Sequence, residues 1–250
     1  MAMGKAEAYR EVLRGLAEWD EYLLQECGLP GPRGNIELAR AVAEEGDRAR
    51  FARYLAFDAA QAPTNSPQEF LAFCGVLGQG KLLAGGHRET LETLRRFASD
   101  PRWRVREAVA MALQRWGLVD MNALLDEMVG WSRGILLERR AAAAAVCEPG
   151  LLGEAAHVEQ VLDLQDGITA SLRGEQDRRS DDFQALRKGM GYCWSVAVCA
   201  LPEVGKGRME RWFSSEDRDV RWIMKQNLRK RRLERMDAGW VAHWKSRMGM

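Results

Sequence analysis

The stretch from Asp100 to Trp116 reads DPRWRVREAVAMALQRW, and it decides the fold class of this chain. Its apolar residues recur at intervals of three and four, as on one face of an amphipathic helix. A looser echo, EDRDVRWIMKQNLRKRR, runs from Glu216 to Arg232. Aligning Val105 with Val220 gives both segments an acid-containing turn, a Val-Arg pair and an amphipathic helix, 115 residues apart. Such self-similarity in a helical chain predicts stacked repeats.

The rest of the chain is divided by glycine- and proline-containing breaks, and it has almost no strand signals. We expect helices over residues 6–27, 36–45, 48–60, 67–83, 88–99, 102–116, 122–131, 135–147, 154–172, 181–201, 206–214, 218–232 and 238–247. Ser66 is expected to cap the fourth of these, with Pro67 at its first position. From residue 88 onward the helices form pairs, and each pair must stack on its neighbours to bury its apolar stripe.

The second helices of these pairs share a register. Arg106 and Arg140 are 34 residues apart, and Trp194 and Arg221 are 27 apart. The step of 54 residues from Arg140 to Trp194 is expected to absorb the polar insert RGEQDRRSDD at 173–182. These spacings are typical of two-helix repeats.

Composition limits the class of protein. Hydrophobic residues make up 46% and charged residues 29%, as in ordinary globular proteins. No apolar run approaches the roughly 20 residues of a membrane span, and the N-terminus lacks the apolar core of a signal peptide. Five cysteines form no CxxC pair and are expected to be reduced, buried thiols. We therefore expect a monomeric, cytoplasmic protein that does not associate with membranes.

Motifs for metals, cofactors and nucleophilic catalysis are not found. The segment Gly75–Lys81, GVLGQGK, matches the start of a phosphate-binding loop, but Leu82 stands where the Ser or Thr is needed. No strand precedes it, so a glycine-weakened helix or a turn between helices is expected. The three histidines form neither HxxxH nor HExxH. We expect no metal and no cofactor.

The unit DPRWRVREAVAMAL resembles a HEAT-type repeat, with Asp100 and Pro101 in the turn and Val105 at the start of the second helix. The segment SSEDRDVRWIMKQNL is similar, with Asn227 where the motif prefers a small residue. This resemblance covers about two thirds of the chain and implies an all-α, right-handed α-solenoid of two-helix repeats. The chain is then a single solenoid over 1–250, with irregular helices over 1–85 and more regular repeats over 86–250. Fold alone does not define function.

The C-terminal end is basic. Residues 205–250 contain 13 Lys or Arg and 6 Asp or Glu, a net charge of +7, which leaves −6 for the rest because the whole chain carries +1. One expected helical face carries a stripe of cations around an indole: Arg218, Trp222, Lys225, Arg229 and Arg232. A phosphate backbone with an unstacked base can use such a stripe. A solvated helix face with Trp222 packed on the next repeat is the alternative.

A second set of residues is Trp103, Glu107, Arg139, Arg140 and Trp194. If the second helices line one groove, these residues converge there. The set resembles the DNA-alkylation-repair branch of HEAT-like proteins, which lifts alkylated purines off DNA with a Trp, a carboxylate one turn away, an Arg from the next repeat and a second Trp. That resemblance implies Glu107 as the catalytic carboxylate, where the branch uses Asp. Trp103 as a spacer between repeats and Glu107 as an ion-pair partner are the plainer interpretation.

The sequence thus leaves three functions open. The first is a non-catalytic binding module whose concave or basic C-terminal surface binds nucleic acid or an acidic protein. The second is a DNA glycosylase-like enzyme that excises N3- or N7-alkylated purines. The third is a protein–protein scaffold whose basic face only meets solvent.

Overall fold

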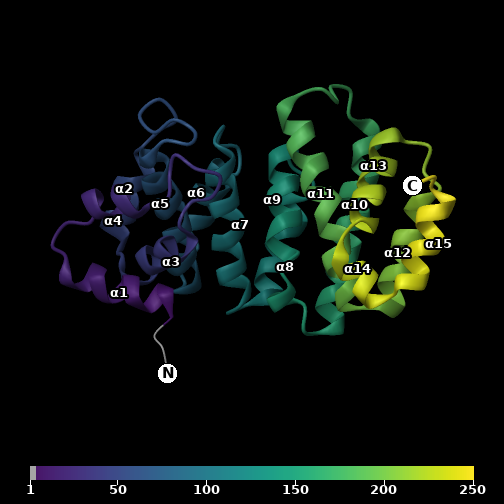
Figure 1. Cartoon of the computed structure of the whole chain (residues 1–250), viewed down its shortest axis with the longest axis horizontal. Coiled ribbons are helices and arrows are strands. Elements are labelled where there is room, and N and C mark those ends of the chain that lie inside the picture. Colours follow the sequence, from purple (N-terminus) through teal and green to yellow (C-terminus); the bar gives the residue numbers. More distant parts are fainter. Residues whose placement is uncertain (1–3) are drawn as a thin grey trace. The chain divides into compact units, whose positions relative to one another are not determined.

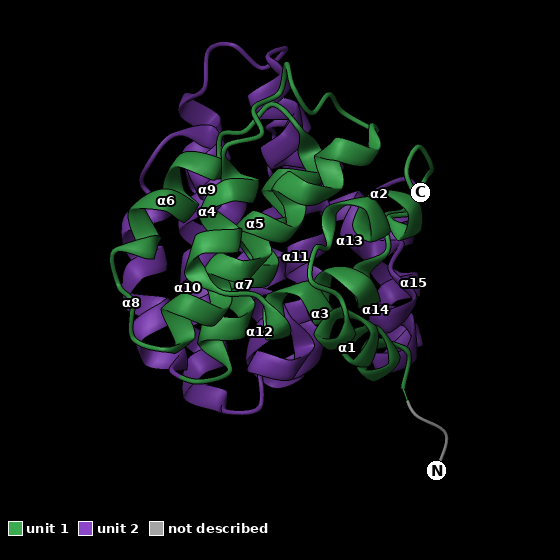
Figure 2. Ribbon diagram, turned by 90° about the vertical axis from the view of Figure 1, so that its left-hand side faces the viewer, with its two compact units in different colours: residues 1–119 green, residues 120–250 purple. Residues whose placement is uncertain are grey.

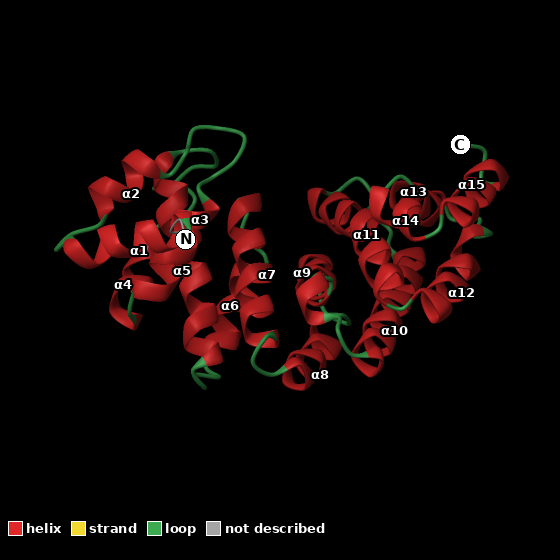
Figure 3. Ribbon diagram, turned by 60° about the horizontal axis from the view of Figure 1, so that its bottom comes forward, coloured by secondary structure: helices red, strands yellow, loops and turns green. Residues whose placement is uncertain are grey.

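The computed structural model of the chain describes residues 4–250, and this part folds into helices without a strand (Figure 3). It divides into two compact units, one ending at Val119 and the other running from Asp120 to Met250 (Figure 2). The division falls between α7 (Trp103–Gly117) and α8 (Met121–Trp131). None of the described helices combines the length and hydropathy that crossing a bilayer requires.

Unit 1 is built around one buried helix, α5 (Pro67–Ala84). Its other helices are α1 (Lys5–Gly15), α2 (Asp20–Glu26), α3 (Ile36–Glu45), α4 (Arg48–Leu55), α6 (Thr90–Phe97) and α7, coloured purple to teal in Figure 1. All of these except α1 pack against α5, and α1 packs against α3. Ser66 caps α5 through its side chain, and Pro67 stands in the first turn, as predicted. Most of α5 is buried, which explains why its sequence lacks an amphipathic pattern.

The glycines of the run Gly75–Lys81 lie inside α5, so this run is a helix and not a phosphate-binding loop. They lie where neighbouring helices approach closely. A Cβ at Gly80 would lie 2.6 Å from Cα of Ala112 in α7, and one at Gly78 would overlap the ring of Phe51 in α4. The glycines therefore allow α4 and α7 to pack directly on the α5 backbone.

The stretch that predicted the fold forms a turn followed by α7, as expected. Val105, Ala108, Val109, Ala112 and Leu113 are fully buried, which confirms the predicted apolar face of the helix.

The turn that precedes α7 carries a buried ion pair. The Arg102 guanidinium binds both carboxylate oxygens of Asp100, at 2.7 and 2.9 Å, and is 1% exposed. Its Nη1 also donates to the carbonyls of Phe57, Asp58 and Ala62. The turn is thereby attached to the loop that follows α4.

Unit 2 consists of helical pairs arranged in two rows. Its helices are α8, α9 (Leu136–Val146), α10 (Ala155–Ser171), α11 (Asp181–Ala200), α12 (Pro202–Phe213), α13 (Arg218–Leu228), α14 (Arg231–Met236) and α15 (Ala238–Arg247), with short 3-10 helices at Pro149–Leu151 and Leu172–Gly174. The first helices, α8, α10 and α12, pack in sequence, and so do the second helices, α9, α11 and α13. Figure 3 shows these two rows within the unit.

Two of the predicted helices are each divided in two. The one expected over 6–27 is broken between α1 and α2, where the indole of Trp19 donates to the carbonyl of Leu13 near the end of α1. The one expected over 218–232 ends at Leu228, because Lys230 adopts an extended backbone and α14 begins anew. Asp217 caps α13 by accepting from the amides of Asp219 and Val220, and its negative charge is favourable at a helix N-terminus.

Asn227, where the HEAT motif prefers a small residue, is fully buried between α13 and α11. Its amide donates to the carbonyls of Met190 and Ile223, both at 2.9 Å, and its oxygen accepts from the Ser195 amide at 2.8 Å. The side chain satisfies three backbone groups, so a small residue here would leave two helices without these bonds.

Candidate functional surface

The predicted site residues fall in both units. Trp103 and Glu107 belong to unit 1, whereas the other eight lie in unit 2. We therefore describe each group within its own unit, and the convergence of Trp103, Glu107, Arg140 and Trp194 in one groove stays a prediction.

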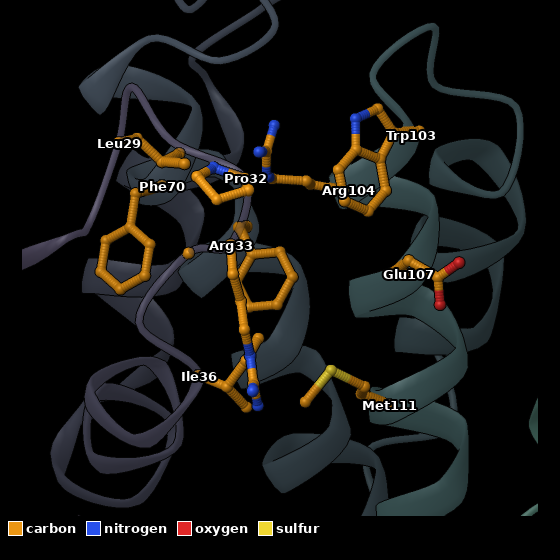
Figure 4. Close-up of a pocket in the computed structure, with 11 residues that line it drawn as sticks. Leu29, Pro32, Arg33, Ile36, Phe70, Trp103, Arg104, Glu107 and Met111 are labelled. Atoms are coloured by element: carbon orange, nitrogen blue, oxygen red, sulfur yellow. The ribbon is translucent and has the colours of Figure 1, made fainter.

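Trp103 and Glu107 line one cavity of unit 1, with a volume of about 290 Å³ (Figure 4). They lie one turn apart on α7, as the sequence predicted. Trp103 is 46% exposed, and the guanidinium carbon of Arg104 lies 4.4 Å from the centre of its ring. The indole is therefore available to a ligand and not packed as a spacer in the core.

Trp194 has no exposed face. It is fully buried in α11, and its indole N–H donates to the hydroxyl of Thr169 at 3.0 Å. A base cannot stack on this ring, so the prediction of Trp194 as a ligand platform is wrong. The residues before and after Trp194 in α11 are mostly apolar and buried, and its indole N–H points toward α10.

The two neighbouring arginines of α9 differ in their surroundings. Arg139 pairs with Glu175 at 2.5 Å and donates to the carbonyl of Gly134 at 2.7 Å, so its guanidinium anchors the polar insert to α9. This use competes with the predicted role of Arg139 in binding a ligand. Arg140 is partly exposed, and its Cγ lies 3.4 Å from where a Cβ would be on Gly189 of α11.

The outward side of α13 carries most of the predicted cationic stripe. Arg218, Trp222, Lys225 and Arg229 follow each other at helical spacing, opposite the buried apolar face of the helix. Arg232 is not on this helix, because α13 ends at Leu228 and a new helix, α14, begins after Lys230. The expectation of one continuous helical face is therefore wrong for its last member.

Trp222 is held on the surface by α11. The guanidinium carbon of Arg187 lies 3.8 Å from the centre of the indole, a cation–π contact. The same guanidinium forms an ion pair with Asp219 at 2.8 Å. The indole is partly exposed and lies over Gly191, which lacks a side chain that would push it away.

Tyr192 is a member of this surface that the sequence did not reveal. It is 43% exposed on α11, and Arg232 donates to its hydroxyl. The guanidinium carbon of Arg232 lies 4.6 Å from the ring centre, and Nζ of Lys230 lies at 5.5 Å. Because the helix is interrupted at Lys230, Lys230 and Arg232 both lie near the ring of Tyr192 on the neighbouring helix α11. In the sequence, the position of Tyr192 on the polar side of its helix was the one signal that could have indicated its place on this surface.

We call the residues that share this outward side of α11, α13 and α14 the basic surface. They are Lys188, Tyr192, Arg218, Trp222, Lys225, Arg229, Lys230 and Arg232.

The acids at the start of α13 are engaged mainly by arginines outside the basic surface. Arg178 of the insert binds Asp217 at 2.7 Å and Asp219 at 3.0 Å. Hydrogen bonding to Arg178 holds the pKa of Asp217 below its usual value and raises that of Arg178. Asp219 also pairs with Arg187 at 2.8 Å and, at 3.5 Å, with Arg218 of the basic surface, whereas no ion pair among residues 4–250 joins these two acids to the surface's other cations.

The cysteines supply no nucleophile for a reaction at either site. Four of them are buried, which confirms that prediction, and Cys199 is partly exposed. Burial raises the pKa of the Cys147 and Cys199 thiols, so they stay protonated at neutral pH. Among residues 4–250, no group of three His, Cys, Asp or Glu side chains is placed to hold a metal ion.

Comparison with protein family models, with curated proteins and with solved structures gave no match.

Proposed function

We propose that this protein is a helical-repeat binding module, a right-handed α-solenoid of HEAT-like pairs, whose basic surface binds the phosphate backbone of nucleic acid. The order of packing in unit 2 supports the repeat architecture, because first helices contact first helices and second helices contact second helices. The basic surface lies on the row of second helices.

The observation that carries this proposal is the pairing of cations with partly exposed aromatic rings. Tyr192 lies between Lys230 and Arg232, and Trp222 lies beside Lys225 and under Arg187. Cations supply sequence-independent affinity for phosphates, and aromatic faces offer stacking to unpaired bases. An acidic protein would use the cations but has less need of the rings.

The test is binding of fluorescently labelled nucleic acid, single- and double-stranded, at increasing salt. We expect affinity to fall steeply, with a slope of log K against log salt near −0.9 per phosphate contact on a duplex and about −0.7 on a single strand. Replacing both Lys225 and Arg229 with alanine should reduce that slope by about two contacts. Both side chains are at the surface, so folding should be unaffected.

The matched control removes Lys5 and Arg40, two exposed cations of unit 1, and should leave the slope unchanged. Binding that is insensitive to salt, or equal losses in both double variants, would contradict the proposal. Affinity for an acidic polypeptide but not for nucleic acid would assign the basic surface to a protein partner.

Excision of alkylated purines is the second candidate, because Trp103 and Glu107 do line a common cavity. The burial of Trp194 and the engagement of Arg139 weigh against it. We expect no release of 7-methylguanine from methylated DNA above the rate without protein. Release that is lost in Glu107→Gln but kept in Glu92→Gln, an exposed acid on α6, would instead establish the enzyme.

A further inference from the structure

The cavity of unit 1 is a built compartment and not a gap between loose side chains. Leu29, Pro32, Ile36, Phe70, Phe73 and Met111 form its apolar walls, with Trp103 and Glu107 on the α7 side (Figure 4). The rings of Phe70 and Phe73 are nearly parallel, with centres 6.3 Å apart. Its volume of about 290 Å³ lies just below the usual range for ligand pockets, roughly 300–1,000 Å³, and suits a small ligand.

The loop that closes the cavity, residues 28–34, is held at both ends. Gly28 has a φ of 73°, and the Asn35 amide donates to the carbonyl of Cys27 at 2.8 Å. At the tip, the Gly31 carbonyl accepts from Arg104 at 2.7 Å, and its amide donates to Asn65 at 3.0 Å. The compartment therefore exists before any ligand enters, which lowers the cost of binding.

Arg104 presents an unused donor in the lining. Its side chain is 8% exposed and crosses the cavity from α7 toward the Pro32 loop (Figure 4). Its two Nη atoms are bonded to Glu69, Asn65 and Gly31, but its Nε is buried with no hydrogen-bond partner among the described residues. A buried donor without a partner is costly, and an acceptor on a ligand would satisfy it.

The second cation in the lining is Arg33. Arg33 makes no ion pair or side-chain hydrogen bond within residues 4–250, and it runs along the cavity toward Ile36. Figure 4 shows the Glu107 carboxylate turned away from the Phe70 side. The groups left for a ligand on that side are therefore a guanidinium, a lone N–H donor and aromatic walls.

We propose that this cavity is a binding site for a small aromatic carboxylate. The planar ring would lie among Phe70, Phe73 and Trp103, and the carboxylate would accept from Nε of Arg104. The exposed side chain of Arg33, which lies toward Ile36 at the other end of the cavity, would turn to pair with the bound carboxylate. Aromatic walls favour a flat apolar body through offset or edge contacts. Charge-assisted bonds from arginine select an anion over a neutral or cationic analogue of the same shape. This site is independent of the basic surface.

The test is equilibrium binding of three naphthalene derivatives to the full chain. Naphthoate, naphthylmethanol and naphthylmethylamine share the ring but present an anion, a neutral group and a cation. We expect one naphthoate per chain, about tenfold weaker binding of the alcohol, and weaker binding still of the amine.

Two variants locate the site. Arg33→Gln should weaken naphthoate about tenfold and leave the alcohol unchanged, because the residue is exposed and contributes only charge. Arg40→Gln, an exposed arginine of α3 outside the lining, should change neither. Met111→Trp should fill the cavity and abolish binding of both compounds, with circular dichroism to confirm that the variant is folded.

Failure of naphthoate to bind at millimolar concentration would overturn the proposal, as would tighter binding of the amine than of naphthoate. Equal effects of Arg33→Gln and Arg40→Gln would also overturn it, and this comparison stands even if Met111→Trp does not fold. None of these outcomes depends on nucleic-acid binding by unit 2.

Discussion

Replacing Arg102 with alanine is expected to lower the free energy of unfolding of unit 1 by about 3–5 kcal/mol, the range for breaking a buried ion pair from one side. The Asp100 carboxylate, whose side chain is 8% exposed, would keep its charge without its partner. The carbonyls of Phe57, Asp58 and Ala62 would lose the same donor.

Urea unfolding followed by circular dichroism measures the effect. The control is Arg96→Ala, an exposed arginine of α6, which should change stability by no more than about 0.5 kcal/mol. Replacing both partners, Asp100→Ala with Arg102→Leu, should cost less than Arg102→Ala alone, since no uncompensated charge remains buried. A loss below about 1 kcal/mol for Arg102→Ala would show that the turn does not depend on this pair.

Adding one methyl group at Gly80 is expected to destabilise unit 1 by about 1–3 kcal/mol, although alanine is the better helix former. The new Cβ would lie 2.6 Å from Cα and 2.7 Å from the carbonyl oxygen of Ala112. Both are backbone atoms of α7, so no side chain can rotate to relieve the contact. The helices α5 and α7 would have to separate.

The matched substitution is Gly130→Ala, in the exposed part of α8, where a Cβ would meet nothing within 4 Å. It should stabilise the protein by up to about 1 kcal/mol through helix propensity alone. The two changes are chemically identical and should have opposite signs in thermal unfolding. An unchanged or raised midpoint for Gly80→Ala would show that α5 and α7 do not pack at this distance.

Helix positions were largely predictable, because apolar periodicity and capping residues are local signals. The α7 face from Val105 to Leu113 and the Ser66 cap follow directly from sequence. The break between α13 and α14 does not, since Arg229 and Lys230 are ordinary helix formers and no glycine or proline marks the end. A contact with Tyr192 on another helix accompanies that break, and such a contact leaves no local pattern.

The candidate sites were less predictable than the helices. Trp194 stands in the apolar run YCWSVAVCA, and this context was a better guide to its burial than its register with Arg140. Tyr192 meets Arg232 from 40 residues away, and Arg33 shares a cavity with Met111. Residue type and spacing cannot indicate such pairs without knowledge of which helices are neighbours.

Arg178 has a consequence for how the C-terminal unit loosens. In a row of helical pairs the last pair frays first, because it has a neighbour on one side only. Arg178 lies in the insert before α11, yet it holds Asp217 and Asp219 at the beginning of α13, in the pair that follows. The start of α13 can separate from the insert only when both of these ion pairs break. The insert thus holds the first turn of α13, the helix that carries Trp222 and Lys225, in place without a bound partner.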